Sequence, residues 1–458
     1  MKALSSLAIL TLALTGCDSD ESSASSTDQP LARNVVIILA DDLGYADVGY
    51  HGCKDVPTPN IDRLAAQGVQ FTDGYVTGSV CGPTRAGLMS GRYQQKIGSQ
   101  NNIGERRISE DTPYGLPLEI STLADRFKEL GFVTGCFGKW HLGGELLFDK
   151  RLFPTNRGFD EFYGFLEGAA RYEDANNVER KYIRGDTVLD GEEAYYTEAL
   201  GREAVSFIER HKDERFFLYV PFNAVHAPMQ ATEADLKRMA HIKDPNRRTL
   251  AAMLISLDDQ VGRIMRSLED QGISDDTLLV FLSDNGGKPT NNYSLNHPLR
   301  GEKNTAYEGG IRIPYCLQWP AALQAGQTRN EPVSSLDLFP TTLVAVGGSV
   351  DTAWQLDGIN LVPALLTDGE IPTRPLYWKE NGHRAIRHGD WKLINQHNTG
   401  WQLFNLSEDL SETCDLAQQH PEKASSLKAN YHAWDSQNQP GFYGWDKALP
   451  FHSKRVPR

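Results

Sequence analysis

Three features are missing from this sequence: an apolar segment long enough to span a bilayer beyond the first residues, an internal repeat, and an excess of basic residues. A membrane-spanning helix needs about 20 mostly apolar residues, and no later stretch has that length. The formal net charge is −14. This argues against a nucleic-acid binder, because affinity for phosphate backbones comes largely from lysine and arginine. An acidic chain can still bind an anion if its cations gather at one place.

Cysteine is also scarce, with six in 458 residues. Two of them, Cys17 and Cys81, stand in motifs described below. The other four are Cys53, Cys136, Cys316 and Cys414. Export would permit disulfides, and four cysteines allow three pairings that sequence does not choose among. We expect one bridge at most, because two of the four lie in apolar strand-like runs, where a free buried thiol is common.

The first residues have the pattern of an export signal. Lys2 precedes an apolar run over residues 3–14, and small residues follow up to Cys17. A charged start, a short apolar core and small residues before a cut are typical of a secretory signal. The last four residues of the signal, 14–17, also resemble a bacterial lipoprotein box, in which the cysteine becomes the lipidated amino terminus; an ordinary signal with an incidental cysteine is the alternative. We therefore expect an exported protein, periplasmic or lipid-anchored, with a flexible Ser- and Asp-rich tether over residues 18–32.

Strands and helices alternate from residue 34 to about residue 345. Residues 34–40 and 278–283 are continuous apolar runs, which are typical of strands buried on both faces of a parallel sheet. Residues 118–130, 194–211 and 250–268 have the apolar spacing of helices. The pattern predicts an α/β fold, with a large, mostly parallel central sheet flanked by helices.

After residue 375 the pattern changes to short runs separated by turn residues. The four runs are residues 376–380, 384–387, 391–395 and 402–406. They predict a small antiparallel sheet, on which a helix over residues 421–434 would pack. A chain of this length is too long for one small core. We expect a large domain over residues 33–372 and a smaller α+β domain with an irregular tail over residues 373–458.

Polar side chains follow the ends of several predicted strands. They are Asp41 and Asp42, Lys139 and His141, His226, Asp284 and Asn285, and, after the last strand, Lys303. Ligands of open α/β sheets bind beyond the carboxyl ends of strands. A lone lysine is usually solvated, a lone histidine is usually structural, and one aspartate can cap a helix. Their joint occurrence at equivalent strand ends favours a single binding site, and the two adjacent aspartates favour a metal.

Residues 79–92 place a cysteine and an arginine at the start of a short helix. Pro83 suits the first helical turn and Gly91 suits the end of the helix. Cys81 would then lie at the amino end, where free N–H groups and the helix dipole favour anions. Arg85 follows one turn later on the same face. A bare C-x-P-x-R is more often a buried cysteine beside a surface arginine, so the rest of the chain decides.

The whole stretch from Cys81 to Arg92 resembles the maturation signature of the type I sulfatases, of the alkaline phosphatase superfamily. In that family the cysteine is oxidised to formylglycine, whose hydrated aldehyde is the nucleophile. Other segments match the family in order: D-D-x-G-Y, G-K-W-H-L-G, H-x-P, S-D-N-G, and G-x-K before Y-E-G-G. The resemblance covers residues 34–320 strongly and the rest by pattern. The chain is identified as a member of this family.

The resemblance implies a divalent-metal site and a set of catalytic groups. The implied metal ligands are Asp41, Asp42, Asp284, Asn285 and the matured Cys81. Oxygen donors suit Ca²⁺, with Mg²⁺ second. The implied catalytic residues are Cys81, Arg85, Lys139, His141, His226 and Lys303. By the resemblance, the arginine orients the hydrate, the lysines hold sulfate oxygens, His226 protonates the leaving oxygen and His141 takes a proton from the sulfated intermediate; the two histidine roles are exchangeable.

The sequence points to a sulfated polysaccharide or oligosaccharide as substrate. The first hundred residues resemble sulfatases of marine bacteria that act on algal galactans such as carrageenan, and also glycosaminoglycan sulfatases that act on galactosamine sulfates. We favour the galactan, and expect a formylglycine-generating enzyme as partner and no nucleic acid. Two other functions stay open: a formylglycine-dependent phosphate or phosphonate monoester hydrolase, and a non-catalytic lectin that binds sulfated glycans.

Specificity is expected in loops outside the common site, over residues 98–107, 146–190 and 290–300. Cationic residues in these loops that could meet further sulfates are Arg106, Arg107, Arg171, His297 and Arg300. For any single one of them, a solvated surface charge is the more common role.

Overall fold

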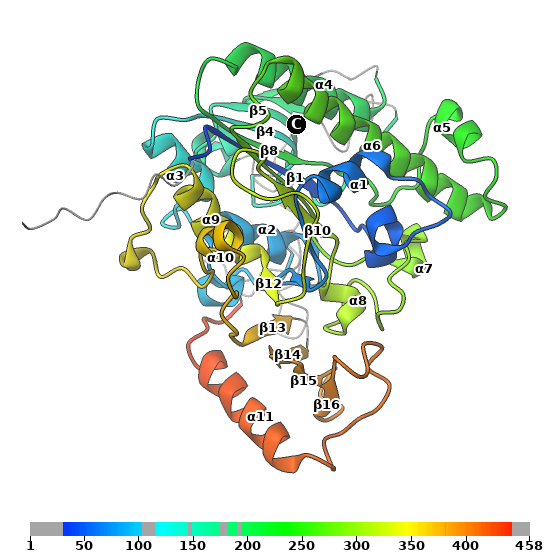
Figure 1. The fold of residues 1–458 in the computed structure, drawn as a ribbon, viewed down its shortest axis with the longest axis vertical. Coiled ribbons are helices and arrows are strands. Elements are labelled where there is room, and N and C mark those ends of the chain that lie inside the picture. The colour runs from blue at the N-terminus through cyan, green and yellow to red at the C-terminus, as the bar shows by residue number, and fades with distance from the viewer. Residues whose placement is uncertain are drawn as a thin grey trace, which may run out of the picture. The chain divides into compact units, whose positions relative to one another are not determined.

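The structure, a computed structural model, describes residues 31–102, 115–144, 149–173, 182–189, 194–380 and 382–441. The predicted signal and nearly all of the predicted tether lie outside these residues. The chain from Leu31 onward forms one compact unit around a ten-stranded sheet (Figure 1). Among the described residues, no helix has the length and apolar character needed to cross a membrane.

Five parallel strands form the centre of the large sheet. In spatial order they are β9 (Thr277–Ser283), β1 (Asn34–Ala40), β8 (Phe216–Pro221), β4 (Val133–Lys139) and β5 (Glu161–Phe165). Every residue of the first three is buried, because helices cover both faces of the sheet. The predicted α/β class is confirmed, and the strand order makes the carboxyl ends of β9, β1, β8 and β4 immediate neighbours.

The outer strands are short and make the sheet mixed. They are β10 (Tyr315–Gln318), β2 (Val69–Phe71) and β11 (Gln327–Arg329) beyond β9, and β6 (Ile183–Arg184) and β7 (Thr187–Val188) beyond β5. Antiparallel pairs join β10 to β9 and β2, and join β5, β6 and β7. A separate two-stranded sheet pairs β3 (Gly74–Tyr75) with β12 (Val333–Ser334).

Strand β5 was not predicted, because its region reads as a long polar excursion with scattered aromatics and glycines. Gly164 within it pairs with Gly138 of β4. A Cβ atom on Gly164 would lie 1.9 Å from the Gly138 carbonyl oxygen, so the two strands require glycine at this contact. The glycine that weakens the strand pattern in the sequence is therefore what permits the pairing.

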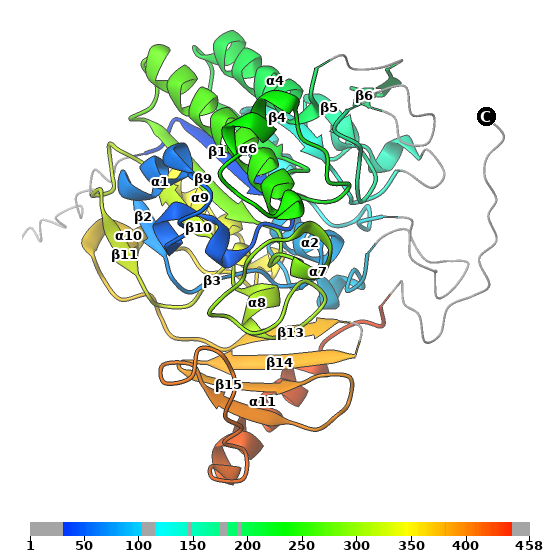
Figure 2. The same cartoon turned by 90° about the vertical axis from the view of Figure 1, so that its right-hand side faces the viewer.

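Helices lie on both faces of the sheet (Figure 2). One face packs on α1 (Pro59–Ala66), α4 (Tyr196–His211) and α6 (Pro245–Asp270). The other packs on α2 (Cys81–Ser90), α3 (Leu123–Glu129), α9 (Leu338–Ala345) and α10 (Val362–Thr367). Shorter helices are α5 (Glu233–Arg238), α7 (Pro289–Asn292) and α8 (Glu308–Ile311), and 3-10 turns span Tyr45–Asp47, Gly49–His51, Gln94–Ile97, Lys150–Leu152, Pro154–Asn156, Ser335–Asp337 and Thr352–Trp354.

Helix α3 begins five residues later than predicted. Thr122 caps it, and its side chain accepts a hydrogen bond from the Asp125 N–H, while the Asp125 carboxylate accepts from the Thr122 N–H. This reciprocal capping box fixes the helix start. The apolar residues before it, counted as part of the helix in the prediction, lie in a turn.

The carboxy-terminal sheet has the four predicted strands in sequential order. They are β13 (Leu376–Glu380), β14 (His383–His388), β15 (Trp391–Asn395) and β16 (Gln402–Asn405), and α11 (Pro421–Asp435) covers one face. Trp378 and Ala385 on the other face pack with Tyr75 and Ile311 of the main body. This small sheet is thus joined to the rest of the chain through a shared core, and β13 is the strand nearest the main body (Figure 2).

The four cysteines outside the motifs form no disulfide. Cys53, Cys136, Cys316 and Cys414 are all free, as is Cys81. Cys136 and Cys316 are buried in β4 and β10, where they act as small apolar side chains. We expected one disulfide at most, and the described cysteines form none.

A fully buried lysine links the carboxy-terminal sheet to the main body. The Lys392 Nζ lies 2.8 Å from a carboxylate oxygen of Glu308 and 2.8 Å from one of Glu412. Burial raises the pKa of both carboxyls. For Glu308 the combined attraction of Lys392, Arg312 and Arg387 outweighs burial and lowers the pKa to about 2, while for Glu412 burial prevails and raises the pKa to about 7. One cation therefore holds two buried acids in place.

Replacing Lys392 by methionine should lower the free energy of unfolding by about 3–5 kcal/mol, because it leaves buried carboxylates without their cation. Adding Glu412→Gln should recover part of the loss, since it removes one of the two charges. Lys128, in an exposed pair with Asp160, is the control: Lys128→Met should change stability little. Chemical denaturation of the three variants measures this, and equal small losses at both lysines would contradict the role of the buried pair.

Candidate active site

The structure brings all of the predicted site residues to one edge of the central sheet. They are Asp41 and Asp42 after β1, Lys139 and His141 at the end of β4, His226 after β8, Asp284 and Asn285 after β9, Cys81 and Arg85 on α2, and Lys303 before α8. The carboxyl ends of parallel strands share one edge, so the strand order β9-β1-β8-β4 makes these groups neighbours.

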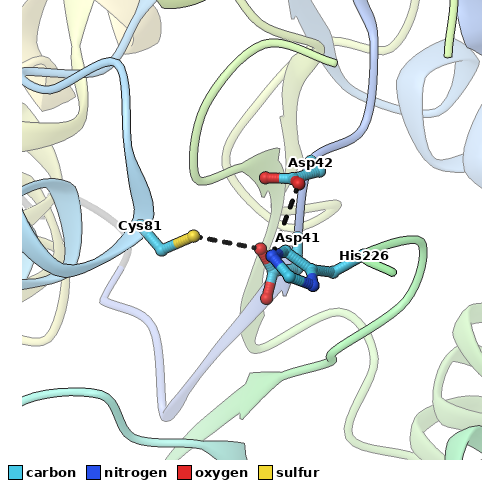
Figure 3. Close-up of side chains that lie close together, drawn as sticks. All are labelled: Asp41, Asp42, Cys81 and His226. Carbon is cyan, nitrogen blue, oxygen red and sulfur yellow. Dashed lines mark hydrogen bonds and ion pairs between the residues drawn. The ribbon is translucent and has the colours of Figure 1, made fainter. Parts of the chain in front are cut away.

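Cys81 is the first residue of α2 and lies between an acid and a base. Its Sγ is 3.4 Å from the Asp41 Oδ1 (Figure 3). It is also 3.2 Å from the Lys303 Nζ. The same Lys303 Nζ is 2.6 Å from the Asp42 Oδ1. Gly91, in the left-handed conformation with φ of 65°, ends the helix as predicted. The start of α2 therefore points the cysteine into the group of charges.

The thiol of Cys81 is inert as it stands. Its side chain is 2% exposed, and burial, with the nearby Asp284 and Asp41 carboxylates, raises its pKa to about 12. A thiol with that pKa is protonated at neutral pH and is a poor nucleophile and a poor metal ligand. This site gains a nucleophile only if the side chain of Cys81 is chemically changed.

Arg85 and Lys139 are buried cations paired with buried acids. The Arg85 Nη2 lies 2.7 Å from the Asp284 Oδ2, and the Lys139 Nζ lies 2.6 Å from the Asp41 Oδ2. The Arg85 Nη1 also donates to the Lys139 carbonyl oxygen at 2.8 Å. Arg85 is 0% exposed, so the alternative of a surface arginine does not apply. Burial disfavours its charge, but Asp284 and the other neighbouring acids raise its pKa above the ordinary value.

The main chain of Asp42 is held by side chains that the sequence did not reveal. Asp42 has a positive φ of 59°, a conformation that needs support in a residue other than glycine. The Asn292 Nδ2 and the Ser294 Oγ each donate to its carbonyl oxygen at 3.0 Å. The Asn285 Nδ2 donates to the Asp42 Oδ1 at 2.7 Å. Asn292 and Ser294 belong to a polar loop with no motif, so no sequence signal identified them.

The donor set fits a hard divalent cation. One ligand atom from each of Asp41, Asp42, Cys81 and His226 lies within 4.8 Å of all the others. The buried Asn285 Oδ1 has no hydrogen-bond partner, as expected for an oxygen left for a metal ion. The predicted ligand Asp284 adjoins this group, because its Oδ1 accepts from the Asp42 N–H at 3.3 Å. Carboxylate and amide oxygens are the ligands that Ca²⁺ and Mg²⁺ prefer.

The two site histidines differ in their surroundings. The His226 Nδ1 is 2.5 Å from the Ala227 carbonyl oxygen, to which it donates, so its Nε2 faces the site, 3.6 Å from the Asp42 Oδ2 (Figure 3). The His141 Nδ1 is buried without a partner. Burial lowers the pKa of both; Lys139 and Arg85 lower that of His141 further, whereas Asp42 and Asp41 oppose the shift for His226.

Of the cationic residues proposed for the specificity loops, the structure describes Arg171, His297 and Arg300. Arg106 and Arg107 lie outside the described residues. The Arg300 Nη1 donates to the Glu412 carbonyl oxygen at 2.6 Å, and its guanidinium lies over the Tyr307 ring. Arg171 and His297 are exposed. Arg300 therefore joins the carboxy-terminal part to the main body.

The central sheet carries at its carboxyl edge a group of buried carboxylates, three buried basic side chains and a cysteine at a helix start. The fold is that of the alkaline phosphatase-like superfamily. The chain belongs to the sulfatase family: the family model described as "Sulfatase" matches residues 33–348. A second model, "N-sulphoglucosamine sulphohydrolase, C-terminal", matches residues 301–434. Members of this family are sulfuric ester hydrolases.

The chain is similar to known sulfatases that differ in the substrates for which they are named. Over 403 residues the chain is 34% identical to arylsulfatase J of Mus musculus, an alignment that covers 84% of this chain and 65%, just under two thirds, of that protein. N-acetylgalactosamine-6-sulfatase of Homo sapiens is 33% identical over 374 residues, covering 78% of this chain and 69% of that protein. The crystal structure of Ps i-CgsB in complex with k-i-k-neocarrahexaose is 35% identical, with a TM-score of 0.84, covering 91% and 96% of the two chains.

Proposed function

We propose that this protein hydrolyses sulfate monoesters of a sulfated galactan of the carrageenan type. The observation that carries the proposal is the convergence of Cys81, the acids Asp41 and Asp42, and the lysines Lys139 and Lys303 within direct contact of one another. Cleavage of a sulfate ester, whose oxygens carry negative charge, needs this combination: a nucleophile, a hard cation and basic side chains.

Two groups absent from the chain as encoded complete the site. Formylglycine made from Cys81 supplies a hydroxyl nucleophile, and a divalent cation, Ca²⁺ or else Mg²⁺, polarises a sulfate oxygen and lowers the pKa of that hydroxyl. Asp41, Asp42, Asp284 and Asn285 are proposed to hold the cation, with the modified residue 81 as a further ligand. In the described structure Asp41 and Asp42 each present an oxygen within 4.8 Å of the Cys81 Sγ, and the side chains of Asp284 and Asn285 are each hydrogen-bonded to Asp42.

The basic side chains bind the sulfate and stabilise the charge that develops on it. Lys303 reaches the side chain of Cys81 directly, and Lys139 reaches it through Asp41. Both ammonium groups are proposed to bind the sulfate oxygens during attack from residue 81 and so to stabilise the transition state. Arg85, fixed between Asp284 and the Lys139 carbonyl, orients the hydroxyl of residue 81.

The histidines move protons. His226 keeps its Nε2 toward the site and is the most accessible of the titratable groups around Cys81. Burial lowers its pKa, but Asp42 and Asp41 oppose that shift, so His226 rather than His141 is assigned to protonate the departing sugar oxygen. His141 is neutral, because burial and Lys139 lower its pKa. A neutral imidazole with an unpartnered Nδ1 suits a base, and His141 is assigned to take the proton whose loss releases sulfate from residue 81.

The substrate class rests on the similarity to the neocarrahexaose-bound structure, which extends over 91% of this chain. A galactosamine sulfate of a glycosaminoglycan is the second candidate, because the chain is 33% identical to human N-acetylgalactosamine-6-sulfatase.

We further propose that the chain is exported by a bacterium and processed near Cys17, with or without a lipid anchor. A formylglycine-generating enzyme modifies it, and residues 33–372 and 373–458 form a catalytic domain and a smaller domain.

A release assay tests the proposal. The protein, with the mass of its Cys81 peptide confirming conversion, is incubated with carrageenans, with chondroitin sulfates and with aryl sulfate and aryl phosphate esters. We expect free sulfate from a carrageenan at a rate well above that from chondroitin sulfates, and faster release from the aryl sulfate than from the aryl phosphate. Faster phosphate release would identify a phosphomonoesterase. Binding without release by the converted protein would identify a lectin.

A further inference from the structure

A carboxylate of the carboxy-terminal sheet holds the segment that carries Cys81. Glu380 is the last residue of β13 and is 5% exposed. Its Oε2 accepts a hydrogen bond from the Ser79 N–H at 2.8 Å and another from the Ser79 hydroxyl at 3.2 Å. Ser79 lies two residues before Cys81, and 301 positions separate it from Glu380 in the sequence. The small sheet therefore contacts the segment that leads into α2.

Ser79 is also tied to the loop that carries the site lysine. Its carbonyl oxygen accepts from the Asn304 N–H at 2.9 Å, and the preceding residue, Lys303, places its Nζ 3.2 Å from the Cys81 Sγ. One residue thus receives a fixed contact from β13 on its N–H side and from the Lys303 loop on its carbonyl side. Together, these bonds set the spacing between the side chains of residues 81 and 303.

Charge makes the Glu380 contact stronger than a neutral one. A hydrogen bond to a buried carboxylate is stronger than one between neutral groups, and leaving either partner unpaired costs more still. Val80, which lies between Ser79 and Cys81, has an extended conformation, and its side chain does not cap α2. The only described side chain that accepts from Ser79 is that of Glu380, so Glu380 holds the residue before Val80, while Asn102 holds the Gly82 N–H after Cys81.

We propose that Glu380 is a positioning residue for the nucleophile: it fixes Ser79, and through Ser79 it fixes the side chain of residue 81 against Lys303. The inference rests on the proposed function for its effect on catalysis. Its structural content, that Glu380 keeps residue 81 in place and shielded, is independent of the reaction. A carboxy-terminal sheet that only stabilised the fold would not need this carboxylate.

The test uses the unconverted protein, in which residue 81 is still a thiol. Alkylation by iodoacetamide is followed at each cysteine by peptide mass. Glu380→Ala should speed alkylation of Cys81 by about tenfold or more, the factor expected for losing a charge-assisted hydrogen bond, with the rate at the buried Cys316 unchanged. Glu380→Gln, which keeps an acceptor oxygen for the Ser79 N–H, should restore most of the protection.

Glu412→Gln is the matched control. Glu412 is another buried carboxylate of the carboxy-terminal part that accepts from a main-chain N–H of the main body, that of Glu308, but it does not contact Ser79. It should leave Cys81 protected. If Glu380→Ala does not fold, Ser79→Ala, which removes only the hydroxyl donor, should give a smaller increase. Unchanged protection of Cys81 in the folded variants overturns the proposal.

In the converted enzyme the same variants separate the two claims. Glu380→Ala should lower kcat by about tenfold with a smaller change in KM, since the nucleophile is misplaced while the lysines still bind sulfate. Faster alkylation together with no sulfatase activity in the wild-type converted protein would sink the proposed function and leave the positioning role. Normal sulfatase activity together with unchanged alkylation of Cys81 in Glu380→Ala would overturn the positioning role and leave the proposed function.

Discussion

Replacing Cys81 by serine is expected to abolish turnover, with kcat lowered by more than about 10³-fold, while binding of a sulfate ester stays measurable. Loss of a catalytic nucleophile typically costs this much or more. Serine lacks the thiol that is to be converted, so no formylglycine forms and the nucleophile is lost. Lys139 and Lys303, proposed to bind sulfate, keep their ion pairs with Asp41 and Asp42, which do not involve the sulfur. Only the contact between the Lys303 Nζ and the sulfur of residue 81 changes.

The experiment compares sulfate release and ligand binding on the same preparations. Cys316→Ser is the control, because Cys316 is also fully buried and free but lies in β10, away from the site. It should keep full activity per folded molecule. Calorimetry with a sulfated oligosaccharide then shows whether Cys81→Ser still binds. Full activity in Cys81→Ser would rule out a nucleophile derived from this residue.

The parts of the fold that could be predicted are those in which one physical signal dominates. Strands β1 and β9 are buried on both faces, so they appear as uninterrupted apolar runs, and their predicted bounds agree with the structure to within one residue. The four strands of the carboxy-terminal sheet were found because turn residues separate them. The end of each central strand then located the site, since polar groups directly after such strands meet at one edge.

The parts that were missed depend on contacts between distant segments. Glu380 and Ser79 are adjacent only because β13 packs beside the entry to α2. No local sequence pattern in either segment predicts this contact. Asn292 and Ser294 support Asp42 from a loop without periodicity. Arg300 was one of several cations that could meet a further sulfate, and its guanidinium donates to the Glu412 carbonyl oxygen. In these cases the residue type indicated which interactions a side chain can make, whereas tertiary packing decided which group it contacts.

Replacing His226 by alanine is expected to cost far more with a sugar or alkyl sulfate than with an activated aryl sulfate. An alkoxide is a poor leaving group and needs a proton as the S–O bond breaks, which a positioned acid supplies at a gain of about 10²–10⁴-fold. A nitrophenolate leaves without help, so its rate should fall by less than about tenfold. His226 suits the role because its Nδ1 is occupied by the Ala227 carbonyl and its Nε2 faces the site.

The kinetic comparison needs two further variants to be decisive. His388, which is exposed at the end of β14 in the carboxy-terminal sheet, is the control: His388→Ala should leave the ratio of alkyl to aryl rates unchanged. His141→Ala should slow both substrates alike, because it acts after the leaving group has departed. If His226→Ala slows both substrates equally and His141→Ala slows the alkyl ester selectively, the two histidines exchange roles, and the proton for the sugar oxygen comes from the more deeply buried ring.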